Sequence, residues 1–187
     1  GDLKRIQRRI GELLLRVATP DYLMSPVRGR SNIDTAAKHR GAASFHLLDV
    51  EDFYPSCTAN KVAWFFRSIL KCSPDVTAIL VRFTTLNEAL PAGSPASPSL
   101  AFWAYQDMWD EIEQLVRADN CQLSVYVDDI TISGNPIPGL LVHAVKERLL
   151  HHGHRFKAAK EAARTGVPVV VTGVVIKDKT LLMPNEQ

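Results

Sequence analysis

The sequence predicts an α+β domain with one antiparallel sheet, and three observations support this class. Amphipathic segments with helical spacing alternate with short apolar runs, in the order strand, helices, hairpin, helix, strands. The 187 residues, 46% of them apolar, are enough for one unit with a core of its own. Internal repeats and low-complexity linkers are absent from the sequence, so we expect one folding unit.

Helices are expected where apolar residues recur three or four positions apart. The first begins near Leu3, carries arginines on its polar face and ends near Thr19 and Pro20. Asn60 is a plausible cap for a helix to about Leu70. The other expected helices cover residues 32–40, 74–85, 99–118 as the longest, and 138–152.

Strands are expected in three places. Residues 44–50 form a short apolar run that ends in acidic residues, and residues 122–134 form a hairpin with Asp128 and Asp129 at its tip. Residues 167–176 and 179–183 are expected to pair as two further strands. Three prolines and a glycine make residues 91–98 a loop.

Composition excludes several classes of protein. No apolar run approaches the roughly 20 residues of a membrane span, and the polar opening is unlike a signal peptide, so we expect a cytoplasmic protein without membrane contact. Three widely spaced cysteines predict reduced, buried thiols. The net charge is only +2, but residues 1–40 carry nine Lys/Arg against four Asp/Glu, which is a possible face for a polyanion.

Two acidic strand ends carry the expected chemistry. Asp49 ends the first strand, and Asp128 and Asp129 lie at the hairpin tip, where simple turn chemistry is the alternative interpretation. Two carboxylates about 4 Å apart repel by roughly 4 kcal/mol at an effective dielectric of 20, so we expect a cation nearby. Carboxylates without His or Cys partners favour Mg²⁺ and two-metal phosphoryl transfer. Glycoside hydrolysis would need one acid in an apolar pocket, which adjacent aspartates do not suggest.

These motifs, taken together, resemble bacterial reverse transcriptases, especially the retron and group II intron types. Six segments match, in the family's order. They are Arg30-Ser31-Asn32-Ile33 with Ala36 and His39, Asp49-Val50-Glu51-Asp52-Phe53-Tyr54-Pro55-Ser56, the loop 90–98, Tyr126-Val127-Asp128-Asp129 as the Tyr-x-Asp-Asp motif, the stretch from Gly153 to Lys160, and Val171-Thr172-Gly173-Val174-Val175. The departures are Ala92, where the family has Gln, and Thr35, where it has Asn.

The resemblance implies a polymerase palm, with an antiparallel sheet, a ferredoxin-like core and helices packed on one face. Residues 1–43 would be part of the fingers and residues 44–187 the palm. The family's upstream fingers hairpin and downstream thumb are not found in these 187 residues, so we expect a fragment with weak or no activity alone. Gly1 would be an expression scar.

The resemblance also implies a role for individual residues. Asp49, Asp128 and Asp129 would be catalytic and bind Mg²⁺, with Mn²⁺ able to replace it, and Lys160 would neutralise or protonate the departing pyrophosphate. Tyr54 would exclude ribonucleotides by steric hindrance; a core aromatic is the alternative for Tyr54 and a surface lysine the alternative for Lys160. The nucleotide-binding residues would be Val50, Tyr54, Gly93, Ser94 and Pro95, and the nucleic-acid-binding residues Arg30, Ser97, Tyr126 and Gly173.

The implied function is RNA-directed DNA synthesis, with an RNA template, a DNA or RNA primer and deoxynucleoside triphosphates as partners. The alternative is a reverse-transcriptase-like scaffold that holds nucleic acid without polymerising, which Ala92 favours and the three aspartates oppose. A nucleotide cyclase on the same fold is disfavoured by the proline-rich loop and by Tyr54. The lineage, the native template and the oligomeric state stay open.

Overall fold

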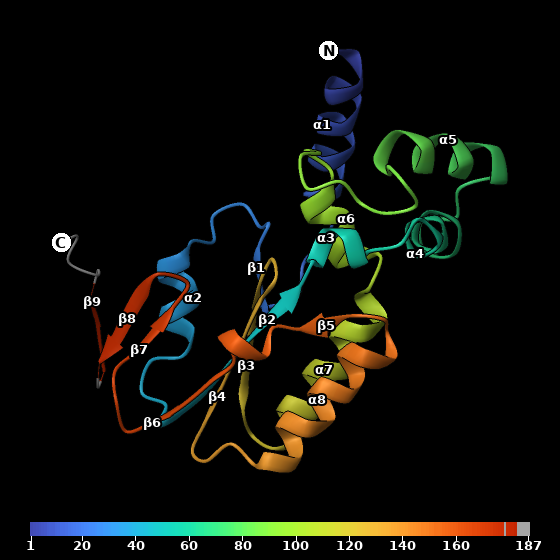
Figure 1. Cartoon of the computed structure of the whole chain (residues 1–187). Coiled ribbons are helices and arrows are strands. Elements are labelled where there is room, and N and C mark those ends of the chain that lie inside the picture. The colour runs from blue at the N-terminus through green and yellow to red at the C-terminus, as the bar shows by residue number, and fades with distance from the viewer. Residues whose placement is uncertain (178, 183–187) are drawn as a thin grey trace. The chain divides into compact units, whose positions relative to one another are not determined.

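The computed structural model describes residues 1–177 and 179–182 and has an α+β architecture (Figure 1). The helices are α1 (Asp2–Leu14), α2 (Asn32–Lys38), α3 (Phe53–Ser56), α4 (Ala59–Trp64), α5 (Pro74–Thr84), α6 (Ser97–Trp103), α7 (Gln106–Ala118) and α8 (Gly139–His151), with a π-helical segment at Phe65–Ile69 and a 3-10 turn at Ala158–Lys160. The strands are β1 (Leu23–Ser25), β2 (Ser44–Glu51), β3 (Gln122–Tyr126), β4 (Asp129–Gly134), β5 (Arg155–Phe156), β6 (Ala162–Thr165), β7 (Val169–Val171), β8 (Val174–Lys177) and β9 (Thr180–Leu182).

The chain folds into two compact units rather than the one we expected. The helical unit comprises residues 1–18 and 52–109, and the sheet unit comprises residues 19–51 and 110–187. The expected division into fingers and palm at residue 43 stays a prediction. It assigns segments to the domains of the family, whereas the two units above are defined only by how compactly their residues pack. Each unit is described below by itself.

The main sheet of the sheet unit is mixed, not purely antiparallel. Its strand order is β1-β3-β4-β2-β5, and β6 pairs with residues 44–47 of β2, on the same side as β5. All pairs are antiparallel except β1 with β3, which is parallel. β1 was missed because three residues followed by a proline carry no periodicity. The ferredoxin-like core stays a prediction.

A second sheet, β7-β8-β9, replaces the expected strand pair. The run 167–176 is two strands joined at Thr172 and Gly173, both of which have positive φ angles. Apolar residues lie on both sides of this turn, so hydrophobic periodicity does not locate it. The family resemblance does indicate the hairpin. Met183, at the end of the expected last strand, lies outside the described residues.

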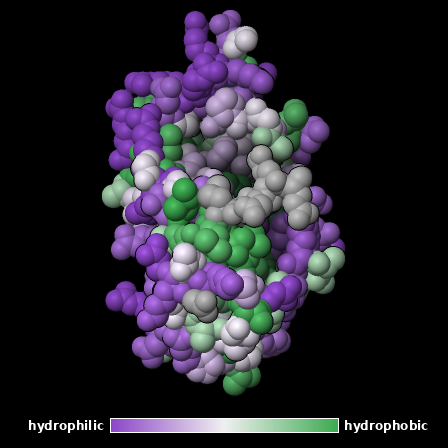
Figure 2. All heavy atoms as spheres, turned by 90° about the vertical axis from the view of Figure 1, so that its left-hand side faces the viewer, coloured by the Kyte–Doolittle hydropathy of each residue, from purple (hydrophilic) through white to green (hydrophobic). Residues whose placement is uncertain are grey.

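One face of the second sheet packs into the core of the sheet unit. Val169, Val171, Val174 and Ile176 contact Phe45 of β2 in one buried apolar cluster, to which Ala36 of α2 also belongs. The opposite face keeps apolar side chains in solvent, as Figure 2 shows on the side where β7–β9 lie. The exposed apolar residues of this sheet are Val170 and Leu182.

A buried histidine joins α2 to the central hairpin of the main sheet. His39, which follows α2, lies 2.7 Å from the hydroxyl of Ser124 on β3 and 2.7 Å from that of Ser133 on β4. Burial, followed by the charge of Lys38, lowers the pKa of His39 to about 3. The ring is therefore neutral at physiological pH, and its two nitrogens hold the two strands of the hairpin in register.

Aromatic rings and local caps organise the helical unit. Phe65 stacks on Trp103, and Phe102 on Trp109, with ring centroids 6.4 Å apart in both pairs. The cap of α4 is Thr58, whose hydroxyl accepts from the N–H of Lys61, rather than the expected Asn60.

The expected longest helix is broken into α6 and α7. The break falls at Ala104 and Tyr105. Tyr105 is buried, and its hydroxyl donates to the carbonyl of Ser56 and accepts from the N–H of Thr58. These tertiary contacts outweigh the helical propensity of the segment, which is why local pattern did not reveal the break.

The expectation of buried, reduced cysteines is only partly met. All three cysteines are free thiols, but only Cys57 is buried, whereas Cys72 and Cys121 are half-buried.

Among residues 1–177 and 179–182, none of the helices has both the length and the apolar character that crossing a bilayer demands.

Candidate active site

The central strand pair brings the acidic strand ends together. In the antiparallel register of β2 and β4, Asp49 is the partner of Asp129. Side chains directly opposite each other lie on the same face, with Cβ atoms typically about 5 Å apart. Asp128 is tied to the same point, because its carbonyl accepts a 2.9 Å hydrogen bond from the N–H of Val50. The two acidic strand ends are therefore adjacent in the sheet, and a shared role for their three side chains stays a prediction.

The hairpin that carries two of the acids has a tight, strained tip. Tyr126 on β3 pairs with Asp129 on β4, which leaves only Val127 and Asp128 in the turn. Val127 adopts a φ of 59°. This left-handed conformation costs a β-branched residue on the order of 1–3 kcal/mol. The turn therefore holds Asp128 and Asp129 at a conformational cost.

Two lysines supply the cation that the acidic cluster requires. The ammonium of Lys157 lies 2.7 Å from Oδ1 of Asp49, and that of Lys160 donates to Oδ2 at 2.5 Å. The backbone N–H of Lys157 also donates to the carbonyl of Asp49 at 2.8 Å. Each oxygen of the buried Asp49 carboxylate thus faces its own positive charge.

The two paired carboxylates have pKa values shifted in opposite directions. Burial alone would raise the pKa of Asp49, but hydrogen bonds and charge from Lys157 and Lys160 outweigh it and lower the pKa. Partial burial, then the charges of Asp128 and Asp49, raise the pKa of Asp129 to about 6. Negative charge at this edge is therefore compensated more fully at Asp49 than at Asp129, where the two lysines offset only part of the effect.

Glu161 anchors the 3-10 turn that carries Lys157 and Lys160. Its Oε1 lies 2.8 Å from Nε2 of His46 on β2 and accepts a 2.5 Å hydrogen bond from Lys146 on α8. Lys146 also lies over the ring of Phe156, 4.8 Å from its centroid. Glu161 directly follows Lys160, so these contacts fix the 3-10 turn beside the strand that bears Asp49.

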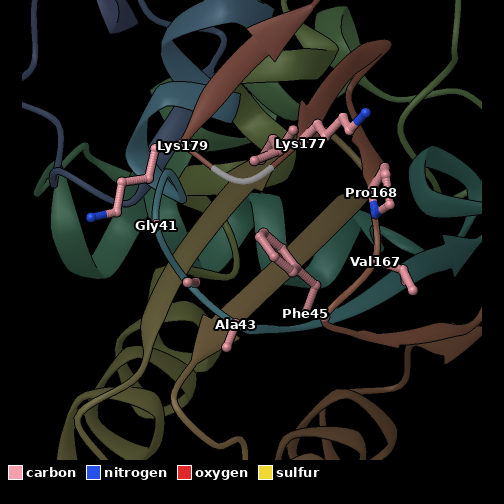
Figure 3. A pocket seen from close by; sticks show the side chains of 10 residues that line it. Gly41, Ala43, Phe45, Val167, Pro168, Lys177 and Lys179 are labelled. Carbon is pink, nitrogen blue, oxygen red and sulfur yellow. The ribbon is translucent and has the colours of Figure 1, made fainter.

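A cavity of about 320 Å³ opens onto the carboxylates. Asp49, Asp129 and Lys160 line one part of it, and Thr172 and Gly173 of the β7–β8 turn line another. A different hollow of about 470 Å³, shown in Figure 3, surrounds the ring of Phe45. None of the described residues that line this second hollow is acidic, so we assign it no part in the chemistry.

The donor set at the strand ends fits a divalent cation. Carboxylate oxygens are the ligands that Mg²⁺ and Mn²⁺ prefer, and Oδ1 of Asp49, opposite Asp129, is buried without a hydrogen-bond partner. Within residues 1–177 and 179–182, however, no three Asp, Glu, His or Cys side chains already surround a common point. Asp49 is turned to its lysines instead.

The remaining expected residues of the sheet unit are found in different settings. Val50 is fully buried on β2, and Tyr126 is half-buried on β3. Gly173 has a φ of 81° in the turn that lines the cavity. Arg30 binds the backbone carbonyls of Pro20 and Leu23, so its guanidinium supports the segment before β1.

The expected residues of the helical unit lie on α3, in the proline-rich loop and at the first position of α6. The ring of Tyr54 is 5.6 Å from that of Phe53. Ser94 and Ser97 are buried, and the hydroxyl of Ser97 donates to the carbonyl of Pro91. A side chain at Gly93 would meet open space, and Pro95 is exposed. The two units are not placed relative to each other, so the distance from these residues to the aspartates stays untested.

Sequence reasoning missed two residues of this site, Lys157 and Glu161. Lys157 stands three positions before Lys160 on the same short turn, and that spacing is the only signal that could have found it. Glu161 has no local signal at all, because its partners His46 and Lys146 are distant in sequence.

Comparison with known proteins agrees with the motifs. The family described as "Reverse transcriptase (RNA-dependent DNA polymerase)" matches residues 2–176. The retron Se72 reverse transcriptase of Salmonella heidelberg (strain 579083-10) is 31% identical over 134 residues, which cover 71% of this chain and 35% of that protein. The retron Ec86 reverse transcriptase of Escherichia coli is 29% identical over 133 residues, covering 71% and 41%.

A third relative matches almost the entire chain. The retron Mx65 reverse transcriptase of Myxococcus xanthus is 28% identical over 208 aligned positions, covering 99% of this chain and 48% of that protein. The chain thus spans between about a third and a half of the length of these relatives. The group II intron part of the resemblance stays a prediction. The chain belongs to the reverse transcriptase family, and its relatives are the retron enzymes of bacteria.

Proposed function

We propose that this chain is the palm portion of an RNA-directed DNA polymerase, which joins deoxynucleoside triphosphates to a primer 3′-hydroxyl. The observation that carries the proposal is the pairing of Asp49 with Asp129, beside Asp128, in a chain of the reverse transcriptase family. Its partners are an RNA template and a DNA or RNA primer. The names of the relatives, all of them reverse transcriptases, support the same activity.

Asp49, Asp128 and Asp129 would hold Mg²⁺, with Mn²⁺ as a substitute. When bound, such ions activate the attacking hydroxyl and stabilise charge on the leaving oxygen. The chain's own part is positional: the strained turn at Val127 presents two carboxylates, and the register of β2 with β4 presents the third. Lys160, whose side chain is largely exposed and whose ammonium group lies beside Asp49, offers a proton to the leaving pyrophosphate.

The other family residues complete the proposal. Tyr54 excludes ribonucleotides, and the backbone at Val50 supports the incoming nucleotide. Gly93, Ser94 and Pro95 contact the nucleotide, and Gly93 suits close approach because nothing lies within 4 Å of its missing Cβ position. The nucleic-acid strands contact Arg30, Ser97, Tyr126 and Gly173.

The decisive experiment is Asp128→Asn in the polymerase that contains this chain. We expect primer extension on an RNA template to fall at least about 1,000-fold, because a metal ligand of the transition state is lost. Thermal unfolding should show that the variant is folded. Asp119→Asn, a matched change at an exposed aspartate, should extend primers normally. Extension by Asp128→Asn at the wild-type rate would contradict the proposal and favour the scaffold interpretation.

Sugar discrimination tests the role of Tyr54 separately. We expect Tyr54→Val to reduce the preference for deoxynucleotides over ribonucleotides by roughly 10- to 100-fold, because the ring no longer blocks the 2′-hydroxyl. Tyr54→Phe keeps the ring and should keep the preference. The ratio of kcat/KM for the two nucleotides is the measurement, and an unchanged ratio in Tyr54→Val would assign this residue to packing alone.

A further inference from the structure

The carboxylate at the centre of the site is already occupied by protein cations. Oδ1 of Asp49 faces Lys157 at 2.7 Å, and Oδ2 faces Lys160 at 2.5 Å. Oδ2 accepts a hydrogen bond from Lys160, whereas the buried Oδ1 has no hydrogen bond and meets Lys157 as an ion pair. A divalent cation that binds Asp49 must therefore take the place of at least one ammonium group.

The two lysines differ in how firmly they are held. The side chain of Lys160 is 60% exposed, whereas that of Lys157 is 35% exposed. The backbone of Lys157 is hydrogen-bonded to the carbonyl of Asp49 itself, on the strand segment where Val50 pairs with Phe156. Lys160 is held only through its exposed side chain, whereas the backbone of Lys157 keeps that residue beside Asp49 whatever its side chain does.

We propose that Lys157 is a resident counter-ion of Asp49 that competes with the divalent metal for Oδ1 and so sets the metal affinity of the site. This inference rests on the proposed function, because it assumes that Asp49 is a metal ligand. In the absence of metal, Lys157 neutralises a buried carboxylate that would otherwise repel Asp129. Its loss leaves Asp49 uncompensated and open to a cation from solution.

The test is a Mn²⁺ titration of this chain, followed by the electron paramagnetic resonance signal of free Mn²⁺. Lys157→Gln removes the competing charge and keeps the backbone hydrogen bond, so we expect Mn²⁺ to bind about three- to tenfold more tightly. Lys157→Met should tighten binding by a similar factor, because it also lacks the charge. Lys157→Arg retains a cation and should bind Mn²⁺ no more tightly than the wild type.

A matched control separates competition at Asp49 from the change in net charge. Lys177→Gln removes the same charge from an exposed lysine on β8, and its Mn²⁺ affinity should stay within about twofold of wild type. Unchanged or weaker binding by Lys157→Gln would overturn the inference, as would equal tightening by Lys177→Gln. Circular dichroism of each variant verifies that the fold is retained.

The same titration distinguishes this inference from the proposed function. If the wild type binds Mn²⁺ and Asp49→Asn weakens that binding, the metal site stands, whatever Lys157→Gln does. If the wild type binds no Mn²⁺, or Asp49→Asn leaves its affinity unchanged, then the metal site and this inference both fail. Tightening by Lys157→Gln, with weakening by Asp49→Asn, supports both.

Discussion

The carboxylate of Asp129 opposes folding of the metal-free chain at neutral pH. Its pKa is about 6 in the folded chain, against an ordinary value of 3.8. Between these two pH values the folded state binds more protons than the unfolded state, so stability falls as the pH rises from about 4 to about 6. At neutral pH the ionised carboxylate therefore opposes folding in the absence of a metal ion.

Removing this charge should stabilise the metal-free chain. We expect Asp129→Asn to raise the midpoint of urea unfolding at pH 7.5 in the presence of a chelator. The gain should disappear at pH 4 and below, where Asp129 is protonated in the folded wild type. Asp119→Asn, at an exposed site with no resolved role in the cluster, should show no such difference between the two pH values. An equal gain at both pH values would contradict the charge explanation.

Residue-level reasoning from the sequence identified the acids but not their counter-ions. Asp49, Asp128 and Asp129 stand at strand ends inside recognisable motifs, so local pattern was sufficient to select them. It also predicted that a cation would be needed. Lys160 was selected through the family motif, but Lys157 was not, because nothing in its neighbourhood indicates that its side chain reaches a residue on β2.

The β3–β4 hairpin is the element on which the site depends most. Its strands are held by His39 through Ser124 and Ser133, and its tip is the positive-φ residue Val127. A neutral buried histidine with both nitrogens satisfied is a rigid support. The rigidity of the strands allows the turn to keep a conformation that a β-branched residue avoids elsewhere.

Glycine at the tip should relieve this strain. We expect Val127→Gly to raise the free energy of unfolding by about 0.5–1 kcal/mol, since the relieved strain exceeds the entropy that glycine adds to the unfolded chain. Val170→Gly, at an exposed strand position whose φ is not positive, should instead lower it. Urea unfolding of both variants is the measurement. A loss in Val127→Gly equal to that in Val170→Gly would mean that the turn stores no strain.

Elements with strong local signals were predicted well, and those defined by distant contacts were not. Helices α2, α5 and α8, strand β2 and the β3–β4 hairpin lie within one or two residues of their expected bounds. α1 ends at Leu14, before the expected Thr19. β6 was missed because Ala162–Thr165 has no apolar alternation and becomes a strand only by pairing with β2.

At the scale of the whole chain, two compact units and one family are established. The family match spans residues 2–176 and so includes segments of both units. The proposed nucleotide contacts are divided between them, with Tyr54 and the proline-rich loop in one unit and the aspartates in the other. The chain spans about a third to a half of its relatives' length, so its activity stays a proposal.

The sequence by itself determined the order of the motifs, the positions of the three aspartates and the elements that bear them. Each of these features depends only on residues that are close together along the chain. The tertiary structure alone decided that Asp49 is opposite Asp129, that Lys157 and Lys160 neutralise Asp49, and that Glu161 anchors their turn. Lys160 and Asp49 are 111 positions apart. Periodicity and turn chemistry act over a few residues, so a contact across that separation exists only once the sheet has formed.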